Sequence, residues 1–167
     1  MQELFLENKM EKEIIFLVVL DDSQEMFRAL RYAARRSSRN NGRVALLYTF
    51  ETLEFSHWKA VEDIAEVESW KEAESKIKEF ENFVLKFTSK NPKKYIMKGD
   101  RIECIINFLN ANKFITNFVL AASTKESGSD PLISAFTGKQ KSKISVPMTI
   151  IPPNLTEEEI DKLSWIN

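Results

Sequence analysis

Residues 14–20 read Ile-Ile-Phe-Leu-Val-Val-Leu, and Asp-Asp-Ser follows at 21–23. The run is apolar without interruption and rich in β-branched side chains, which is typical of a strand buried on both faces of a parallel sheet. It is far too short to span a bilayer. The polar residues that follow are of the types that cap helices or bind ligands. The stretch therefore predicts a central strand whose carboxyl end opens on a polar turn.

The segment after this strand has the pattern of a helix, with apolar residues at helical spacing over 26–34. Asp22 and Glu25 have the spacing of a capping box. Gly42 suits the left-handed position that ends many helices. A second apolar strand, Val-Ala-Leu-Leu-Tyr-Thr-Phe, follows at 44–50. Strand, helix and strand predict a βαβ unit with a right-handed crossover.

The rest of the chain continues the alternation of helices and strands. After an irregular connection at 52–61, a long helix carries one apolar stripe and is expected to stop at Asn91-Pro92. The stripe consists of Ala73, Ile77, Phe80, Val84 and Phe87. Further strands are predicted at 94–97, 115–122 and 145–151, and further helices are predicted to begin at Asp100 and at Asp130-Pro131. The tail at 154–167 has the pattern of an amphipathic helix. Thr156 and Glu159 suit a capping box, and its apolar face consists of Ile160, Leu163 and Trp165.

This order of elements predicts an α/β fold of three layers, an open five-stranded parallel sheet with helices on both faces. Pro147 has no N–H to give to a neighbouring strand, so the fifth strand should lie at an edge. In such sheets ligands bind beyond the carboxyl ends of the strands. That edge should gather residues 21–23, Phe50, Glu51 and the segment after Ala122.

Composition excludes several classes of protein. Among 167 residues, 43% are hydrophobic and 29% charged, and the net charge of −1 calls for neither nucleic acid nor an anionic membrane as partner. Cys104 is the single cysteine, which excludes an internal disulfide and a CxxC metal site. The first residues have an apolar run only at 4–6, too short for a signal peptide. We therefore expect a cytoplasmic protein.

Four short motifs follow one another along the chain. They are Val-Val-Leu-Asp-Asp-Ser at 18–23, an alanine-rich helix at 29–34, Gly-Asp at 99–100 and Ser-Val-Pro at 145–147. Their joint order and spacing resemble the universal stress protein family. The resemblance covers about residues 13–152. It implies one domain of this kind over residues 1–167, with 153–167 as a C-terminal tail.

The resemblance implies a fold similar to flavodoxin and to the adenine-nucleotide α-hydrolases, with strand order 3-2-1-4-5. It also implies a homodimer that pairs along the fifth strand, between Val146 and Ile151. The tail, which leaves this strand, docks either on its own domain or, as we favour, on the second protomer. Some members of the family bind ATP and others do not.

The ATP-binding members carry Gly-x-x-Gly, nine residues, then Gly and Ser or Thr after the fourth strand. Aligned on the fourth and fifth strands, this motif falls on Ala121, Thr124, Ser134 and Ala135. All of its glycines are therefore replaced. Glycine lets backbone N–H groups approach phosphates closely, and a β-branched residue such as Thr124 would be strained in a left-handed conformation. The usual triphosphate site should be weakened or absent.

A second register of the motif uses Gly128 and Gly138, which are also separated by nine residues. It requires a four-residue shift against both strands and ends in Lys139 rather than Ser or Thr. Gly138-Lys139 is not a Walker loop either, because Gln140 replaces the Ser or Thr that binds magnesium.

The candidate nucleotide-binding residues are Asp21, Ser23, Phe50, Ala121, Thr124, Lys125, Ser134 and Ala135. For Asp21, contact with a base or ribose and local capping are equally good interpretations. Lys125, Lys139, Lys141 and Lys143 either form a phosphate-attracting rim or, as we favour, belong to a solvated helix end.

No catalytic or metal-binding constellation stands out. His57 lies in a loop without a paired nucleophile, and there is no GxSxG motif. Cys104 is best interpreted as a buried structural thiol rather than a redox switch. The aromatic residues of the long helix should pack in the core, although Phe83 and Trp70 could instead form a partner surface.

Two functions remain in view. The first is a non-enzymatic stress-response or regulatory protein with a degenerate ATP motif and no cofactor. The alternative is a variant that holds ATP or AMP in the same crevice through altered contacts. An unrelated doubly wound enzyme, such as a flavin or nucleotidyl-transfer protein, is more remote because no catalytic constellation accompanies the fold.

Overall fold

The computed structural model describes residues 12–21, 23–52, 59–124 and 130–165. A five-stranded, all-parallel sheet forms its middle layer, in the order β3-β2-β1-β4-β5. The strands are β1 (Ile15–Leu20), β2 (Arg43–Phe50), β3 (Lys93–Lys98), β4 (Asn117–Ala121) and β5 (Met148–Ile151). The predicted fold class and strand order are confirmed. β5 lies at an edge, and Pro147 immediately precedes it, which is where a residue without an N–H costs the sheet nothing.

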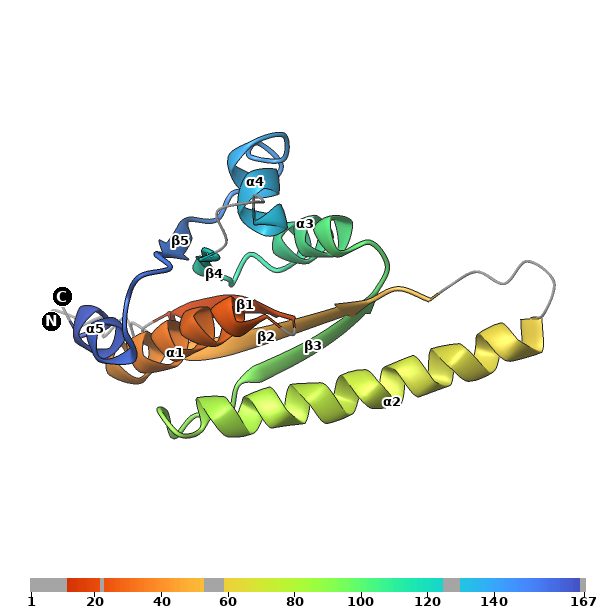
Figure 1. Ribbon diagram of the computed structural model, residues 1–167, viewed down its shortest axis with the longest axis horizontal. Coiled ribbons are helices and arrows are strands. Elements are labelled where there is room, and N and C mark those ends of the chain that lie inside the picture. Colours follow the sequence, from red (N-terminus) through yellow and green to blue (C-terminus); the bar gives the residue numbers. More distant parts are fainter. Residues whose placement is uncertain (1–11, 22, 53–58, 125–129, 166–167) are drawn as a thin grey trace, which may run out of the picture.

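Helices cover both faces of the sheet (Figure 1). One face carries α1 (Gln24–Arg39), α2 (Lys59–Val84) and the short C-terminal α5 (Glu157–Leu163). The other carries α3 (Arg101–Ala111) and α4 (Pro131–Thr137). None of the helices in the described ranges has both the length and the hydropathy needed to cross a membrane.

The central strand β1 explains the uninterrupted apolar run. Ile15, Leu17 and Val19 point into the core beneath α3 and α4, and the alternate residues, starting at Phe16, point into the core beneath α1 and α2. All six side chains of the strand are buried. Burying each such side chain contributes about 1.5–3 kcal/mol relative to exposure. Because both faces are covered, neither set can be polar.

The turns around α1 differ in detail from the expected ones. Ser23 is the N-cap of the helix, since its Oγ accepts a hydrogen bond from the Met26 N–H at 3.2 Å. Asp22, the predicted cap, lies outside the described residues. At the other end, Asn41 takes the left-handed conformation with φ of 49°. Gly42 is needed for a different reason, because a Cβ there would lie 2.6 Å from the carbonyl oxygen of Ile14. The backbone thus passes too close to β1 for any side chain.

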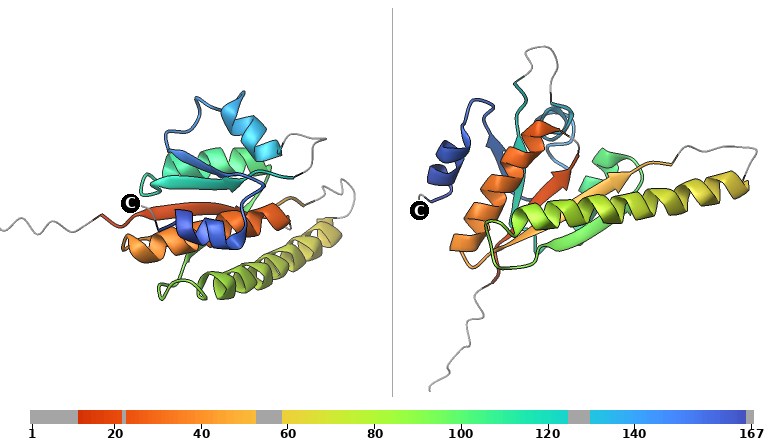
Figure 2. Two further views of the ribbon diagram at one scale, coloured as in Figure 1. Left: turned by 60° about the vertical axis from the view of Figure 1, so that its left-hand side comes forward. Right: turned by 60° about the horizontal axis from the view of Figure 1, so that its bottom comes forward.

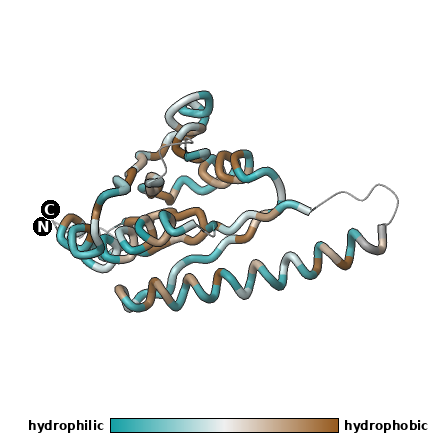
Figure 3. Tube along the Cα trace, in the orientation of Figure 1, coloured by the Kyte–Doolittle hydropathy of each residue, from teal (hydrophilic) through white to brown (hydrophobic). Residues whose placement is uncertain are grey.

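Helix α2 extends well beyond the sheet at its N-terminal end (Figure 1). Its 26 residues span about 39 Å, against about 26 Å for the longest strand. Along this overhang Ile64 and Val67 are 61% and 53% exposed, and hydrophilic and hydrophobic residues alternate along the helix (Figure 3). The helix ends at Val84, and the chain continues in turns toward Pro92, so the predicted stop at Asn91-Pro92 is too late.

The aromatic residues of this region pack within the chain. Phe83 lies edge-on to Phe27 of α1, with ring centroids 5.3 Å apart. Trp70 packs edge-on against Phe50 at the end of β2, with centroids 5.1 Å apart. Phe80 is buried in the core. The core interpretation of the aromatic stripe therefore holds, and the contacts of Phe83 and Trp70 account for their positions without a partner protein.

The C-terminal tail forms α5, which runs beside α1 of its own chain (Figure 2). Thr156 and Glu159 make the predicted capping box. Of the predicted apolar face, Ile160 is buried, whereas Leu163 and Trp165 are 44% and 54% exposed. The helix packs on its own domain through Ile160 and through carboxylates held by the arginines of α1. The exposed part of the apolar face, Leu163 and Trp165, remains open to a second protomer.

Candidate functional site

A cavity of about 310 Å³ opens at the carboxyl ends of β1 and β4, between the N-termini of α1 and α4. We call it the crevice. Its walls are the apolar side chains Val18, Val19, Met26, Ala29, Val119, Leu120, Ala121, Pro131, Leu132 and Ile133, and its polar residues are Asp21, Ser23, Glu25, Ser123 and Asp130. This is the switch point of the strand order, where parallel α/β sheets bind ligands.

Asp130 closes one side of the crevice with an unexpected contact. It stands at the N-cap position of α4, yet its side chain makes no hydrogen bond to that helix. Both of its carboxylate oxygens instead accept the backbone N–H of Ser123, each at 3.0 Å. Backbone N–H groups after a parallel strand are the donors that bind phosphate oxygens in nucleotide sites. In this chain the Ser123 N–H already donates to the carboxylate of Asp130.

The contact belongs to a small polar network that joins three elements. Ser123 follows β4, and its hydroxyl donates to Glu25 Oε1 of α1 at 3.2 Å. Ser123 therefore links the first turn of α1 to the start of α4 through Asp130. The network places two carboxylates beside the position where the resemblance would put phosphates. A phosphate 4 Å from one carboxylate would be repelled by about 4 kcal/mol at an effective dielectric constant of 20.

Asp21 ends β1 at the edge of the crevice. Its Oδ1 accepts the Ser23 N–H at 2.8 Å, which forms a tight local turn before the helix. Its Oδ2 lies 3.9 Å from Arg101 Nη1. The side chain is 26% exposed, so one face of the carboxylate stays open to the crevice. Its hydrogen bond to the Ser23 N–H fits the local structural interpretation. Its place in the wall leaves contact with a base or ribose as a prediction.

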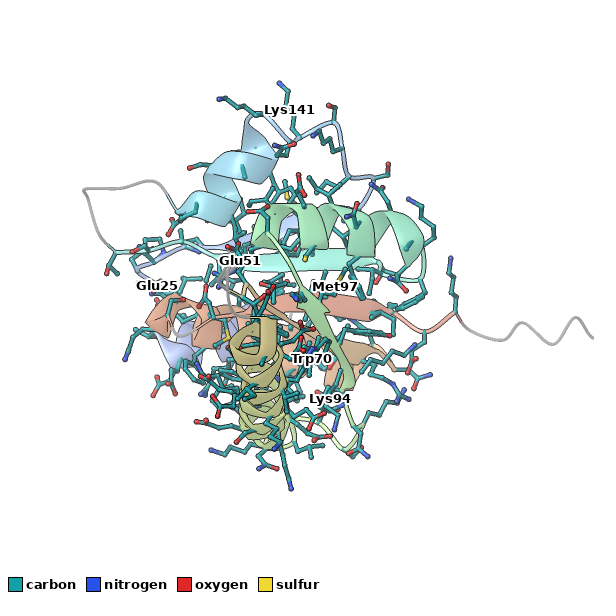
Figure 4. The ribbon with its side chains drawn as sticks, turned by 90° about the vertical axis from the view of Figure 1, so that its right-hand side faces the viewer. Glu25, Glu51, Trp70, Lys94, Met97 and Lys141 are labelled. Carbon is teal, nitrogen blue, oxygen red and sulfur yellow. The ribbon has the colours of Figure 1, made fainter. Side chains whose placement is uncertain are left out.

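The predicted lysine rim does not surround the crevice. Lys139 and Lys143 line a separate cleft between α3 and α4. Lys141 lies beyond the far end of α4, well away from Glu25 (Figure 4). Lys125 falls outside the described residues. Of the described residues that line the crevice, none is cationic, so the solvated-end interpretation holds for Lys141.

The residues aligned with the phosphate motif are not brought together. Ala121 lines the crevice, but Ser134 and Ala135 line the cleft between α3 and α4. Thr124 lines a third cavity, formed between α1 and the start of α5. Phe50 packs on Trp70 of α2. Of the other candidates, Asp21 and Ser23 do line the crevice.

The alternative glycine register has a structural explanation at one end. Gly138 ends α4 and donates its N–H to the carbonyl oxygen of Ser134 at 3.1 Å. A Cβ at this position would lie 2.6 Å from the same oxygen. Helix termination therefore accounts for Gly138 without a ligand. Gly128 lies outside the described residues.

Sequence reasoning placed the segment after Ala122 at this edge of the sheet but did not single out Glu25, Ser123 or Asp130 as crevice residues. Two of them carried a signal, because Glu25 and Asp130 are carboxylates close to strand ends and were assigned to helix capping instead. The sequence around Ser123 contains no signal that marks this serine as a site residue. Its importance comes from the two side chains that converge on it from α1 and α4.

The described residues contain no group of three or more histidine, cysteine or acidic side chains able to hold a metal ion. Cys104 is buried, and burial together with Asp100 and Glu103 raises the pKa of its thiol. Burial fits the structural interpretation of Cys104, and a raised pKa disfavours the reactive thiolate. His57 lies outside the described residues.

Comparison with known proteins agrees with the fold. A model of the universal stress protein family matches residues 15–113. The structure of UspA from Lactobacillus plantarum is similar at a TM-score of 0.66 and 18% identity, over 84% of this chain and 98% of the other. The hypothetical protein MJ0577 is similar at 0.65 and 15%, over 87% and 99%. A universal stress protein in complex with cAMP is similar at 0.53 and 10%, over 83% and 95%. Among curated proteins no match was found.

Proposed function

The chain belongs to the universal stress protein family, and on that premise we propose that it is a non-enzymatic regulatory protein whose crevice does not hold a triphosphate. The observation that carries the proposal is the contact between Asp130 and the Ser123 N–H. A bound phosphate would have to displace this carboxylate and then remain beside it and Glu25. The replaced glycines add a steric obstacle at Ala121 and Thr124.

Titration of the purified protein with ATP tests this directly. We expect no heat beyond dilution, because the crevice presents carboxylates where phosphates would bind. Extraction of the freshly purified protein should release no stoichiometric adenine nucleotide. Micromolar affinity in the calorimeter, or a nucleotide in the extract, would exclude the proposal.

A pair of gain-of-function variants separates the glycine effect from the carboxylate effect. The first carries Ala121→Gly, Thr124→Gly, Ser134→Gly and Ala135→Ser, and the second adds Asp130→Asn. We expect ATP to bind the second at least about tenfold more tightly, because one repelling charge has been removed. Equal affinities in the two variants would show that Asp130 does not govern phosphate exclusion.

The second candidate function is binding of an uncharged adenine nucleoside or a nucleotide with a single phosphate. The apolar walls of the crevice and the open face of Asp21 support it, since they suit a base and a ribose rather than a triphosphate. The similar protein in complex with cAMP supports the same class of ligand. Calorimetric titrations with adenosine, AMP, cAMP and ATP distinguish the two functions. Binding of adenosine, AMP or cAMP without binding of ATP favours the second function.

We further propose that two copies pair along the free edge of β5. The strand bonds to β4 on one side only, and Ile150 is 38% exposed. Sedimentation at tens of micromolar should give a dimer for the natural chain and a monomer for Ile150→Lys. Val67→Lys, on the distant overhang of α2, should remain a dimer. A monomeric natural chain would contradict the pairing, and dissociation by Leu163→Lys would show that α5 contributes.

We place this function in the cytoplasm. The proposal is supported by the use of a single cysteine, since disulfides are common in proteins of oxidising compartments.

A further inference from the structure

Arg28 is a partly buried arginine whose guanidinium is only partly satisfied by hydrogen bonds. It projects from α1, where Nη2 donates to the carbonyl oxygen of Ala122 at 2.8 Å and Nη1 donates to that of Pro153. Its Nε is buried without a hydrogen-bond partner. Among the described residues no carboxylate forms an ion pair with this guanidinium, and its hydrogen-bond acceptors are two backbone carbonyls. A buried donor such as its Nε without a partner is uncommon and calls for an explanation.

The two carbonyls belong to two different functional parts. Ala122 directly precedes Ser123, whose N–H and hydroxyl hold the polar network of the crevice. Pro153 lies in the short connection between β5 and α5. Ala122 also donates its own N–H to the carbonyl oxygen of Ile151, at 2.9 Å. One guanidinium therefore ties the rim of the crevice to the connection that leads into the C-terminal helix.

Helix α5 is held mainly by charge. Asp161 accepts four hydrogen bonds from Arg31 and Arg35, between 2.8 and 3.2 Å. Arg31 also donates to Glu157 at 2.6 Å. Ile160 is the one buried apolar side chain of the helix. A seven-residue helix with so little apolar contact depends on these pairs for its position.

We propose that α5 is a strap that regulates the crevice. Arg28 couples the docking of α5 on α1 to the crevice rim, which consists of Ala122 and Ser123. When α5 is docked, the carbonyl of Pro153 holds the guanidinium against Ala122, and Ser123 stays aligned with Asp130 and Glu25. When α5 detaches, Pro153 moves away and the rim loosens. The inference rests on the proposed function only in taking the crevice as the functional site.

Amide hydrogen exchange of the full-length protein tests the coupling. Asp161→Asn removes the charge that anchors α5 without touching the crevice. We expect exchange at residues 157–165 to accelerate, and exchange at Ala122 and Ser123 to accelerate by about fivefold or more. Glu158→Gln, on the same helix but exposed, should leave both regions unchanged.

A second substitution tests the route. Arg28→Gln should accelerate exchange at Ala122 and Ser123 even with α5 docked, whereas Arg28→Lys, which keeps a donor and the charge, should restore much of the protection. In the double variant Arg28→Gln with Asp161→Asn, the rim should exchange no faster than with Arg28→Gln alone. Additive effects in the double variant would overturn the role of Arg28.

Undisturbed exchange at Ala122 and Ser123 in Asp161→Asn, with α5 itself loosened, would overturn the strap. That result would leave the proposed function intact, because ATP titration does not depend on it. Conversely, micromolar ATP binding would exclude the proposed function while the exchange data could still establish the strap.

Discussion

Replacing Phe136 with alanine is expected to lower the free energy of unfolding by about 3–5 kcal/mol, the usual cost of truncating a fully buried phenylalanine. Phe136 is the one fully buried side chain of α4. Its ring meets Phe118 of β4 edge-on, with centroids 5.5 Å apart. Urea unfolding measured by circular dichroism gives the free energy. Because Asp130 stands at the N-terminus of α4, the burial of Phe136 also helps to hold Asp130 beside Ser123.

Two further substitutions serve as controls for Phe136→Ala. Phe136→Leu keeps most of the volume and should cost less than about 1.5 kcal/mol. Ser134→Ala, at an exposed position of the same helix, should change stability by no more than about 0.5 kcal/mol. A loss below about 1 kcal/mol for Phe136→Ala would mean that α4 is anchored by other contacts.

Asp161→Asn should destabilise the protein by about 2–3 kcal/mol at neutral pH, because Arg31 and Arg35 lose a charged acceptor. The hydrogen bonds from Arg31 lower the pKa of Asp161 below its ordinary value of 3.8, and they outweigh the opposing effect of burial. A carboxylate with a lowered pKa stabilises the fold above its ordinary value. That contribution disappears as the pH falls through 3.8 and below.

The natural chain and Asp161→Asn should therefore differ most at neutral pH and converge in acid. Unfolding followed between neutral pH and pH 3 shows this convergence, with Glu158→Gln as a control that tracks the natural chain throughout. Parallel curves for Asp161→Asn and the natural chain over the whole range would contradict the assignment of Asp161 as the acid-sensitive anchor.

Much of the fold could be predicted because its signals are local. The run at 14–20 has no polar residue to expose, so only a strand covered on both sides suits it. Asp100 accepts the Glu103 N–H as the spacing predicts, and Thr156 with Glu159 forms the predicted capping box. In each case a residue and its partner lie within one helical turn of each other.

The crevice could not be predicted in the same way because its contacts are tertiary. Asp130 has the sequence signature of a helix cap, with Pro131 next to it. Its side chain nevertheless turns to Ser123, seven residues earlier, once β4 and α4 are placed side by side. The position of the C-terminal tail could not be predicted for the same reason. Nothing in its own sequence selects Arg31, 130 residues away from Asp161, over solvent or a second protomer.

The central position of β1 has a consequence for biosynthesis. β1 bonds to β2 and also to β4, and the Ile15 N–H donates to Thr116 Oγ1, a contact between residues 101 positions apart. At a translation rate of about 5–20 residues per second, the ribosome needs about 5–20 s to deliver β4 after β1. During that interval one edge of the most apolar strand has no neighbour. Residues 14–20 therefore keep one unpaired, apolar edge until β4 has been synthesised, which makes chaperone contact with this segment an expected part of the protein's maturation.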